Sequence, residues 1–167
     1  GATRIITFLK LAILARLLTP SQFGLFGIAA LVLAFLEIIT ETGINVFLIQ
    51  HKGKYEEYVN TAWVVSIIRG AAISLMIFLL SPVIATFFKS SAVTSLLYLT
   101  SLIPFIRGFI NPANIRFQKN LEFSKEFRFR FVITFIEFFV SAYLVFVLRT
   151  PESLLYAMIV SGIFEVV

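Results

Sequence analysis

Six long apolar segments, separated by polar connections, constrain this chain more than any other feature of its sequence. A helix that spans a lipid bilayer needs about 20 mostly apolar residues. Segments this long without alternating polarity favour helices, because lipid tolerates only helices and closed barrels. The sequence therefore predicts an all-α, polytopic transmembrane helix bundle. The apolar segments are residues 3–18, 22–49, 59–88, 92–115, 127–148 and 151–167.

Composition argues for the same fold class. Of the 167 residues, 59% are hydrophobic and 14% are charged, whereas a soluble domain is about half apolar and about a quarter charged. A soluble core of this size has too much surface to cover so many apolar side chains. The net charge of +5 then reflects basic loops of a membrane protein, and we expect no nucleic-acid partner.

The chain starts at Gly1 and ends at Val167, in both cases inside an apolar segment. This arrangement predicts a fragment of a longer protein. We expect residues 1–167 to form a single transmembrane domain that is truncated at both ends.

Lys and Arg are distributed unequally between the two sides that alternating helices define. One side carries seven of them and the other side carries three, so the positive-inside rule places the first side, and the start of the chain, in the cytoplasm of a multi-pass inner-membrane protein. The seven are Lys52, Lys54, Arg116, Lys119, Lys125, Arg128 and Arg130, and the three are Arg16, Lys89 and Arg149. Residues 116–130 also read as an amphipathic stretch on the inner interface or, equally, as a solvated loop.

The residue types needed for several kinds of chemistry are missing from the sequence. The chain has no cysteine and one histidine, His51, so Cys-metal and multi-histidine sites are excluded. No nucleotide loop and no GxSxG elbow occurs. We expect no metal, no cofactor, no catalytic residue and no enzymatic activity.

Polar residues inside the apolar segments follow helical spacing, which places them on one stripe per helix. Charges in hydrocarbon are costly and usually face a partner or a watery cavity. Four striped helices therefore predict a shared hydrated interior. The stripes are Thr3, Thr7 and Lys10; Glu37, Glu41 and Asn45; Thr100, Pro104, Arg107, Asn111 and Asn114; and Arg130, Thr134, Glu137 and Ser141.

The segment 59–88 differs from the other segments. Ser66, Gly70 and Ser74 form a line of small residues that allows another helix to approach closely. Arg69 sits beside this line, at roughly the same depth of about 15 Å from the inner helix ends as Glu37. We predict that Arg69 and Glu37 pair, either in a transport cavity or merely to lock the two helices together.

Two further features concern helix shape and interfaces. Pro104 and Pro112 predict a bent helix 92–115, which either lines a transport cavity or is a plain structural kink. Tyr55, Tyr58 and Trp63 are predicted to anchor the chain at the inner interface.

Residues 14–50 resemble a known family. Residues 15–24 (ARLLTPSQFG) match its first interhelical turn, and residues 41–43 (ETG) and 47–50 (FLIQ) match the end of its second helix. Residues 111–117 (NPANIRF) are also similar. On these motifs the chain resembles the polysaccharide biosynthesis family of the MOP flippase superfamily, the Wzx-like O-antigen and exopolysaccharide exporters. Glu41 stands where that family more often has Asp.

The resemblance implies a transporter with two lobes of helices around a central cavity, of which this chain is most of the first lobe. Such proteins carry an undecaprenyl-pyrophosphate-linked oligosaccharide across the cytoplasmic membrane by alternating access, for polysaccharide or O-antigen export. The implied partners are this lipid-linked substrate, membrane lipids, and glycosyltransferases or a polymerase of the same pathway.

Roles for individual residues follow from their chemistry. Cations in a low-dielectric site bind phosphate strongly, and amide and hydroxyl groups bind sugar. The substrate-binding candidates are Lys10, Arg69 and Arg107 for pyrophosphate, with Thr100, Asn111 and Asn114 for sugar. The carboxylates of Glu37, Glu41 and Glu137 either couple transport to ions or neutralise these bases.

Other functions are compatible with a membrane helix bundle. A multidrug cation antiporter of the same superfamily predicts that acidic and aromatic cavity residues outnumber bases. A membrane-embedded polysaccharide polymerase or glycosyltransferase predicts a large catalytic loop, whereas the longest connection here is residues 116–130.

Overall fold

A computed structural model of the chain describes residues 8, 16, 18–41, 55–111 and 123–166, and within these ranges every regular element is a helix. The helices are α2 (Pro20–Ile39), α4 (Tyr55–Phe87), α5 (Ala92–Gly108), α7 (Phe123–Leu148) and α8 (Glu152–Val166). The fold class predicted from the sequence is therefore confirmed. The first predicted helix, residues 3–18, lies almost entirely outside the described residues.

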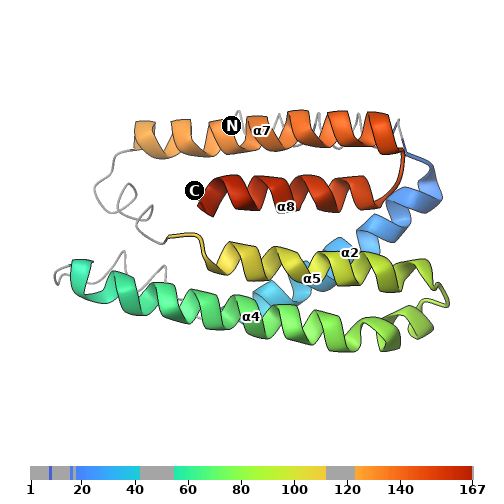
Figure 1. The fold of residues 1–167 in the computed structure, drawn as a ribbon, viewed down its shortest axis with the longest axis horizontal. Coiled ribbons are helices and arrows are strands. Elements are labelled where there is room, and N and C mark those ends of the chain that lie inside the picture. Colours follow the sequence, from blue (N-terminus) through green and yellow to red (C-terminus); the bar gives the residue numbers. More distant parts are fainter. Residues whose placement is uncertain (1–7, 9–15, 17, 42–54, 112–122, 167) are drawn as a thin grey trace.

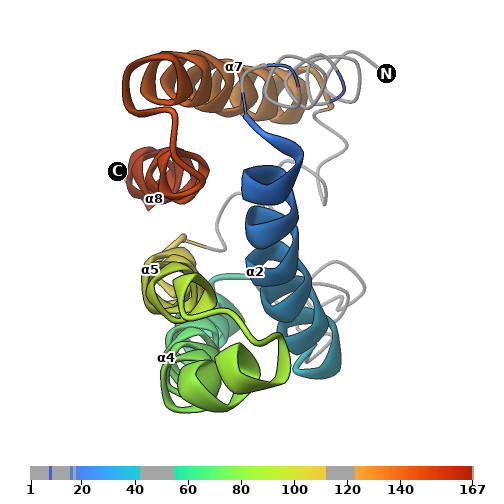
Figure 2. The ribbon, with the colours of Figure 1, turned by 90° about the vertical axis from the view of Figure 1, so that its right-hand side faces the viewer.

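The helices α4, α5, α8 and α7 lie side by side in that order, and α2 crosses them obliquely on one face (Figures 1 and 2). Successive helices run in opposite directions, as the sequence predicted (Figure 1). The turns around Lys89 and Arg149 consequently lie at the same end as the start of α2. Gln22 confirms this arrangement locally, since its Nε2 donates to the carbonyl of Arg149 at 3.0 Å.

The start of α2 explains the turn motif of residues 15–24 in physical terms. Thr19 is the N-cap, its side chain accepts from the amide of Gln22, and the Gln22 side chain accepts from the amide of Thr19. This reciprocal capping box satisfies amides that the first helical turn leaves without partners. Pro20 suits the first helical position because it has no amide hydrogen to satisfy.

Two helices end earlier in the structure than the sequence predicted. The helix predicted over 22–49 ends at Ile39, and the helix predicted over 92–115 ends at Gly108. In the second case Pro112 supplies the reason, because proline disfavours helical geometry in the residue before it, Asn111. Asn111 therefore lies beyond the end of α5 and does not continue its polar stripe.

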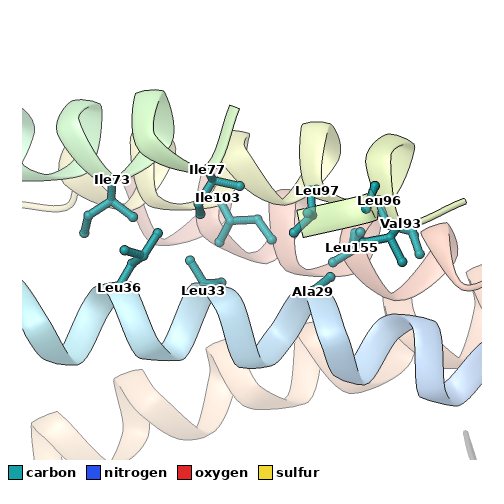
Figure 3. Packing of buried hydrophobic residues seen from close by; sticks show 11 residues of the cluster. Ala29, Leu33, Leu36, Ile73, Ile77, Val93, Leu96, Leu97, Ile103 and Leu155 are labelled. Atoms are coloured by element: carbon teal, nitrogen blue, oxygen red, sulfur yellow. The ribbon is translucent and has the colours of Figure 1, made fainter. Parts of the chain in front are cut away.

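The apolar core joins α2 to α4, α5 and α8. Ala29, Leu33 and Leu36 recur at helical spacing on α2 and insert between the neighbouring helices (Figure 3). Their main partners are Ile73 and Ile77 of α4, Val93, Leu96, Leu97 and Ile103 of α5, and Leu155 of α8.

The outer surface is also apolar, which distinguishes this bundle from a soluble one. Phe35, Leu79 and Phe146 are 59%, 61% and 65% exposed. Within the described residues, α2, residues 59–87 of α4 and residues 130–148 of α7 are long and apolar enough to cross a membrane. An apolar exterior of this kind is stable only against lipid or other apolar chains.

Glycines bring α4 and α5 into backbone contact. A Cβ atom built on Gly70 would clash with the carbonyl oxygen of Pro104, and one on Gly108 would lie 3.0 Å from that of Ser66. The close approach predicted from the small-residue line is confirmed at Gly70, and the facing small residue is Gly108.

Candidate functional site

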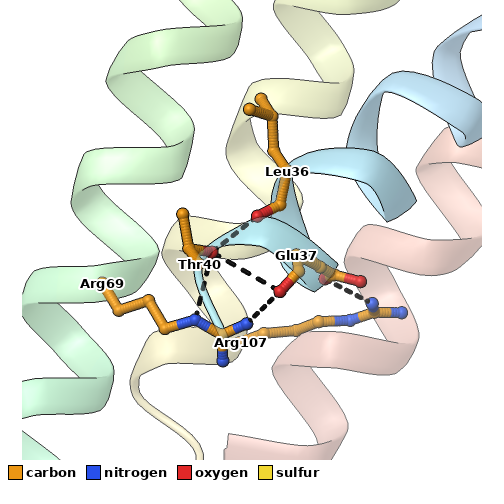
Figure 4. Close-up of polar contacts among 5 residues, drawn as sticks. All are labelled: Leu36, Glu37, Thr40, Arg69 and Arg107. Atoms are coloured by element: carbon orange, nitrogen blue, oxygen red, sulfur yellow. Dashed lines mark hydrogen bonds and ion pairs between the residues drawn. The ribbon is translucent and has the colours of Figure 1, made fainter. Parts of the chain in front are cut away.

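The end of α2 lies against the middle of α4, so a helix terminus falls part-way along a neighbouring helix. Arg69 of α4 donates from Nη2 to the carbonyl of Glu37 at 2.5 Å and from Nε to the hydroxyl of Thr40 at 3.3 Å (Figure 4). Arg69 lies about 21 Å along α4 from Tyr55, at 1.5 Å per residue. A cation at this position neutralises the negative end of the α2 dipole and satisfies a terminal carbonyl that has no helical partner.

The carboxylate of Glu37 faces α5. Its Oε1 forms an ion pair with Nη1 of Arg107 at 3.2 Å (Figure 4). The predicted pairing of Glu37 with Arg69 is therefore corrected: Arg69 binds the main chain of Glu37, and Arg107 binds its carboxylate. The sequence prediction assumed a helix to residue 49, whereas the early end of α2 frees the Glu37 carbonyl for Arg69.

Glu165 brings α8 to the same place. It is half-buried and interacts electrostatically with Arg107, Arg130 and Glu137. Arg130 and Glu137 belong to α7. We call these residues the charged cluster; its members are Glu37, Arg69, Arg107, Arg130, Glu137 and Glu165.

Charge balance makes the charged cluster tolerable among apolar helices. It contains three acids and three bases, contributed by five helices. A single charge in this environment would be costly, whereas opposed charges compensate one another. The cluster also remains reachable, since the side chains of Arg107 and Glu37 are 38% and 34% exposed. A balanced, partly open cluster can exchange an internal carboxylate for an external anion.

Trp63 acts on the end of α5 as Arg69 acts on the end of α2. Its indole Nε1 donates to the carbonyl of Phe109 at 3.0 Å. The sequence predicted Trp63 as an interface anchor, and the structure adds a capping contact to that prediction. The side chains of Tyr55 and Tyr58 lie outside the described part of the chain.

The other predicted site residues are distributed differently. Thr100 is fully buried and donates its hydroxyl to the carbonyl of Leu96 at 2.7 Å, so it does not present that group to a ligand. Asn111 and Glu41 are exposed, beyond the ends of α5 and α2. Lys10 and Asn114 lie outside the described residues.

Sequence reasoning missed Glu165. The same rule that selected Glu37 and Glu137, an acid inside an apolar run, also applies to Glu165 within residues 154–167. It lies near the end of the sequence, where no complete helical stripe could be drawn around it. Only the packing of α8 beside α5 and α7 places it near Arg107 and Arg130.

Apolar helices with apolar outer faces, and balanced charges held between them, define a polytopic helical membrane protein. The chain belongs to the polysaccharide biosynthesis protein family, whose model matches residues 13–167. It is also 27% identical, over 119 residues, to a protein of Klebsiella pneumoniae described as an uncharacterized membrane protein in the cps region. That match covers 71% of this chain and 24% of the relative, so the chain spans about a quarter of the relative's length. No solved structure matches the chain.

Proposed function

We propose that this chain is part of a transporter that moves an undecaprenyl-pyrophosphate-linked oligosaccharide across the cytoplasmic membrane by alternating access. The observation that carries the proposal is the convergence of Arg69 and Arg107, from two helices, on Glu37 of a third. Two of the cations predicted for the pyrophosphate are thereby neighbours. Membership of a polysaccharide biosynthesis family supports a polysaccharide-related role.

The two arginines have different parts in this proposal. Arg69 is bound to the end of α2 and mainly holds the helices in place. The partner of Arg107 is a carboxylate, which an incoming pyrophosphate can replace, because both are anions that accept from a guanidinium. Glu37 is then a resident counter-ion that competes with the substrate for Arg107.

The balance of charges bears on the antiporter alternative. A cation antiporter predicts that acidic and aromatic residues outnumber bases in the cavity, and the acids of the charged cluster do not outnumber its bases, since it holds three of each. The balanced cluster therefore supports an anionic substrate, which can replace the Glu37 carboxylate at Arg107, over a cationic one. We also propose that the chain has a transport role and not an enzymatic one.

Binding of undecaprenyl pyrophosphate to the purified protein in nanodiscs tests the competition directly. Arg107→Gln should weaken binding roughly tenfold or more, as expected when a charge-assisted hydrogen bond is lost. Glu37→Gln should strengthen binding, because it frees Arg107. The matched control is Arg149→Gln, which replaces an exposed base at the opposite end of the bundle. This variant should bind undecaprenyl pyrophosphate as the parent does.

Export is the second readout. Surface polysaccharide should fall with Arg107→Gln at equal protein level in the membrane. Normal export and unchanged pyrophosphate binding in this variant would refute the proposed role of Arg107.

A further inference from the structure

One face of α7 carries a continuous row of phenylalanine rings. Phe127, Phe131, Phe135 and Phe139 follow one another at intervals of four residues, which places them along one side of the helix. Successive ring centroids are 5.8, 6.0 and 4.6 Å apart. These are contact distances for aromatic pairs. We call these four residues the phenylalanine ridge.

Three of the four rings of the phenylalanine ridge face outward, and Phe131 is partly buried. Phe127, Phe135 and Phe139 are 49%, 47% and 54% exposed. Among the described side chains of α7, the buried ones are Ser141 and Val145. The ridge is about 18 Å long at 1.5 Å per residue, more than half of a hydrocarbon layer about 30 Å thick.

Positive charge marks one end of the ridge and not the other. Arg128 and Arg130 are exposed within the first turns of α7, beside Phe127 and Phe131. Beyond Phe139 the helix continues through Tyr143 and Phe146 without a further base until Arg149. The surface therefore complements a molecule with an anionic head and a long apolar tail.

We propose that the phenylalanine ridge binds the polyprenyl chain of the lipid carrier, which runs from the basic end of the ridge at Arg128 and Arg130, while its pyrophosphate head binds Arg107 of the charged cluster. A polyprenyl chain has a flat double bond and a methyl branch in every unit, and the proposal requires these units to pack against the ridge more favourably than a straight acyl chain does. This inference rests on the proposed function, and it adds where the lipid part of the substrate lies. Arg130 belongs to the charged cluster and directly precedes Phe131 of the ridge in α7, so the proposed head and tail sites adjoin.

The test uses ring removal that keeps the surface apolar. Phe135→Leu combined with Phe139→Leu preserves helix propensity and hydrophobicity, so the fold should be maintained. The matched control is Phe87→Leu with Phe88→Leu, an exposed ring pair with centroids 5.2 Å apart at the other end of the bundle. The proteins are reconstituted in phosphatidylcholine nanodiscs.

Three probes separate head from tail. Undecaprenyl pyrophosphate has the full chain, geranyl pyrophosphate has the same head with a short chain, and a diacylglycerol pyrophosphate has the head with acyl chains. The ridge variant should bind undecaprenyl pyrophosphate about tenfold more weakly, as for two lost aromatic contacts. It should bind the other two probes as the parent does, and the control variant should match the parent throughout.

Each contrary result has a distinct meaning. If the parent binds none of the pyrophosphate lipids, the proposed function and this inference both fail. If the parent binds undecaprenyl pyrophosphate and the ridge variant binds it equally well, only the ridge inference fails. An equal loss for acyl and prenyl probes would overturn it in favour of a general lipid-facing surface. A changed oligomeric state without a change in binding would overturn it in favour of a second copy of the chain.

Discussion

Arg69 shows how one side chain can hold two helices together where backbone groups would otherwise lack partners. Its guanidinium reaches the Glu37 carbonyl and the Thr40 hydroxyl, both in the last turn of α2 or directly after it. The terminal carbonyl of Glu37 has no helical partner of its own, so an arginine with several donors is well suited to this position. The main role of Arg69 is therefore structural, since it holds the end of α2 against α4.

The two contacts of Arg69 should contribute unequally to the free energy of unfolding, and removing them one at a time measures each contribution. Arg69→Gln should lower the free energy of unfolding by about 2 kcal/mol, because it removes a charge-assisted hydrogen bond. Thr40→Val removes the weaker contact and should cost about 1 kcal/mol. Unfolding in detergent micelles, followed by circular dichroism, measures both. Equal losses in the two variants would contradict this assignment.

The partner of the Glu37 carboxylate can be identified with double-mutant cycles. Glu37→Gln and Arg107→Gln should show a coupling free energy of about 1 kcal/mol, which is modest because both side chains are about one-third exposed. Glu37→Gln and Arg69→Gln should couple less, because the carbonyl that Arg69 binds survives the change at residue 37. A larger coupling with Arg69 than with Arg107 would contradict the geometry described above.

At the scale of elements, the pair α4 and α5 is the tightest contact among the helices that the structure describes. The two backbones meet at Gly70 and Gly108, where a side chain has no room. Close approach of this kind increases dispersion contacts, which are a main source of helix association within lipid. Trp63 then closes the same pair near its end through the Phe109 carbonyl.

Glycine substitutions distinguish this contact from the rest of the bundle. Gly70→Ala forces backbone to move and should destabilise the protein by about 1–3 kcal/mol. Gly27→Ala on α2 is the matched control, since nothing lies within 4 Å of the added Cβ. It should leave stability unchanged or raise it by up to about 1 kcal/mol through helix propensity. Thermal unfolding of both variants in one detergent gives the comparison, and similar midpoints would refute the backbone contact.

For the whole molecule, alternating helices separate the two ends of the bundle. The turns at Lys89 and Arg149 occupy one end, and the starts of α4 and α7 occupy the other (Figure 1). The lysine and arginine count assigns the second end to the cytoplasm, which stays a prediction.

Because the chain has no cysteine, single cysteines can report the orientation. Ser90→Cys and Thr150→Cys should react with a membrane-impermeant thiol reagent in intact cells. Ser124→Cys, exposed near the start of α7, should react only after the membrane is permeabilised. The reverse pattern would invert the proposed orientation.

Much of the fold was predictable, because hydrophobic length and polar spacing are local properties of a sequence. The helical class, the antiparallel order and the close approach at Gly70 all followed from such local patterns. The helix ends were less predictable. Apolar residues resume at Ile44 and continue past Gly108, so hydropathy alone favours longer helices, although residues 40–43 (TETG) and Asn111-Pro112 offered stop signals for α2 and α5.

The sequence predicted which residues form much of the site, but it did not predict which of them interact with each other. Lone charges in apolar runs selected Glu37, Arg69 and Arg107, because a charge in lipid is costly wherever it occurs. Which atoms meet depends on where α2 ends and on how it crosses α4 and α5, and those are properties of packing. Tertiary structure alone therefore assigned the Glu37 carboxylate to Arg107, gave Arg69 the end of α2, buried Thr100, and brought Glu165 from a distant part of the chain.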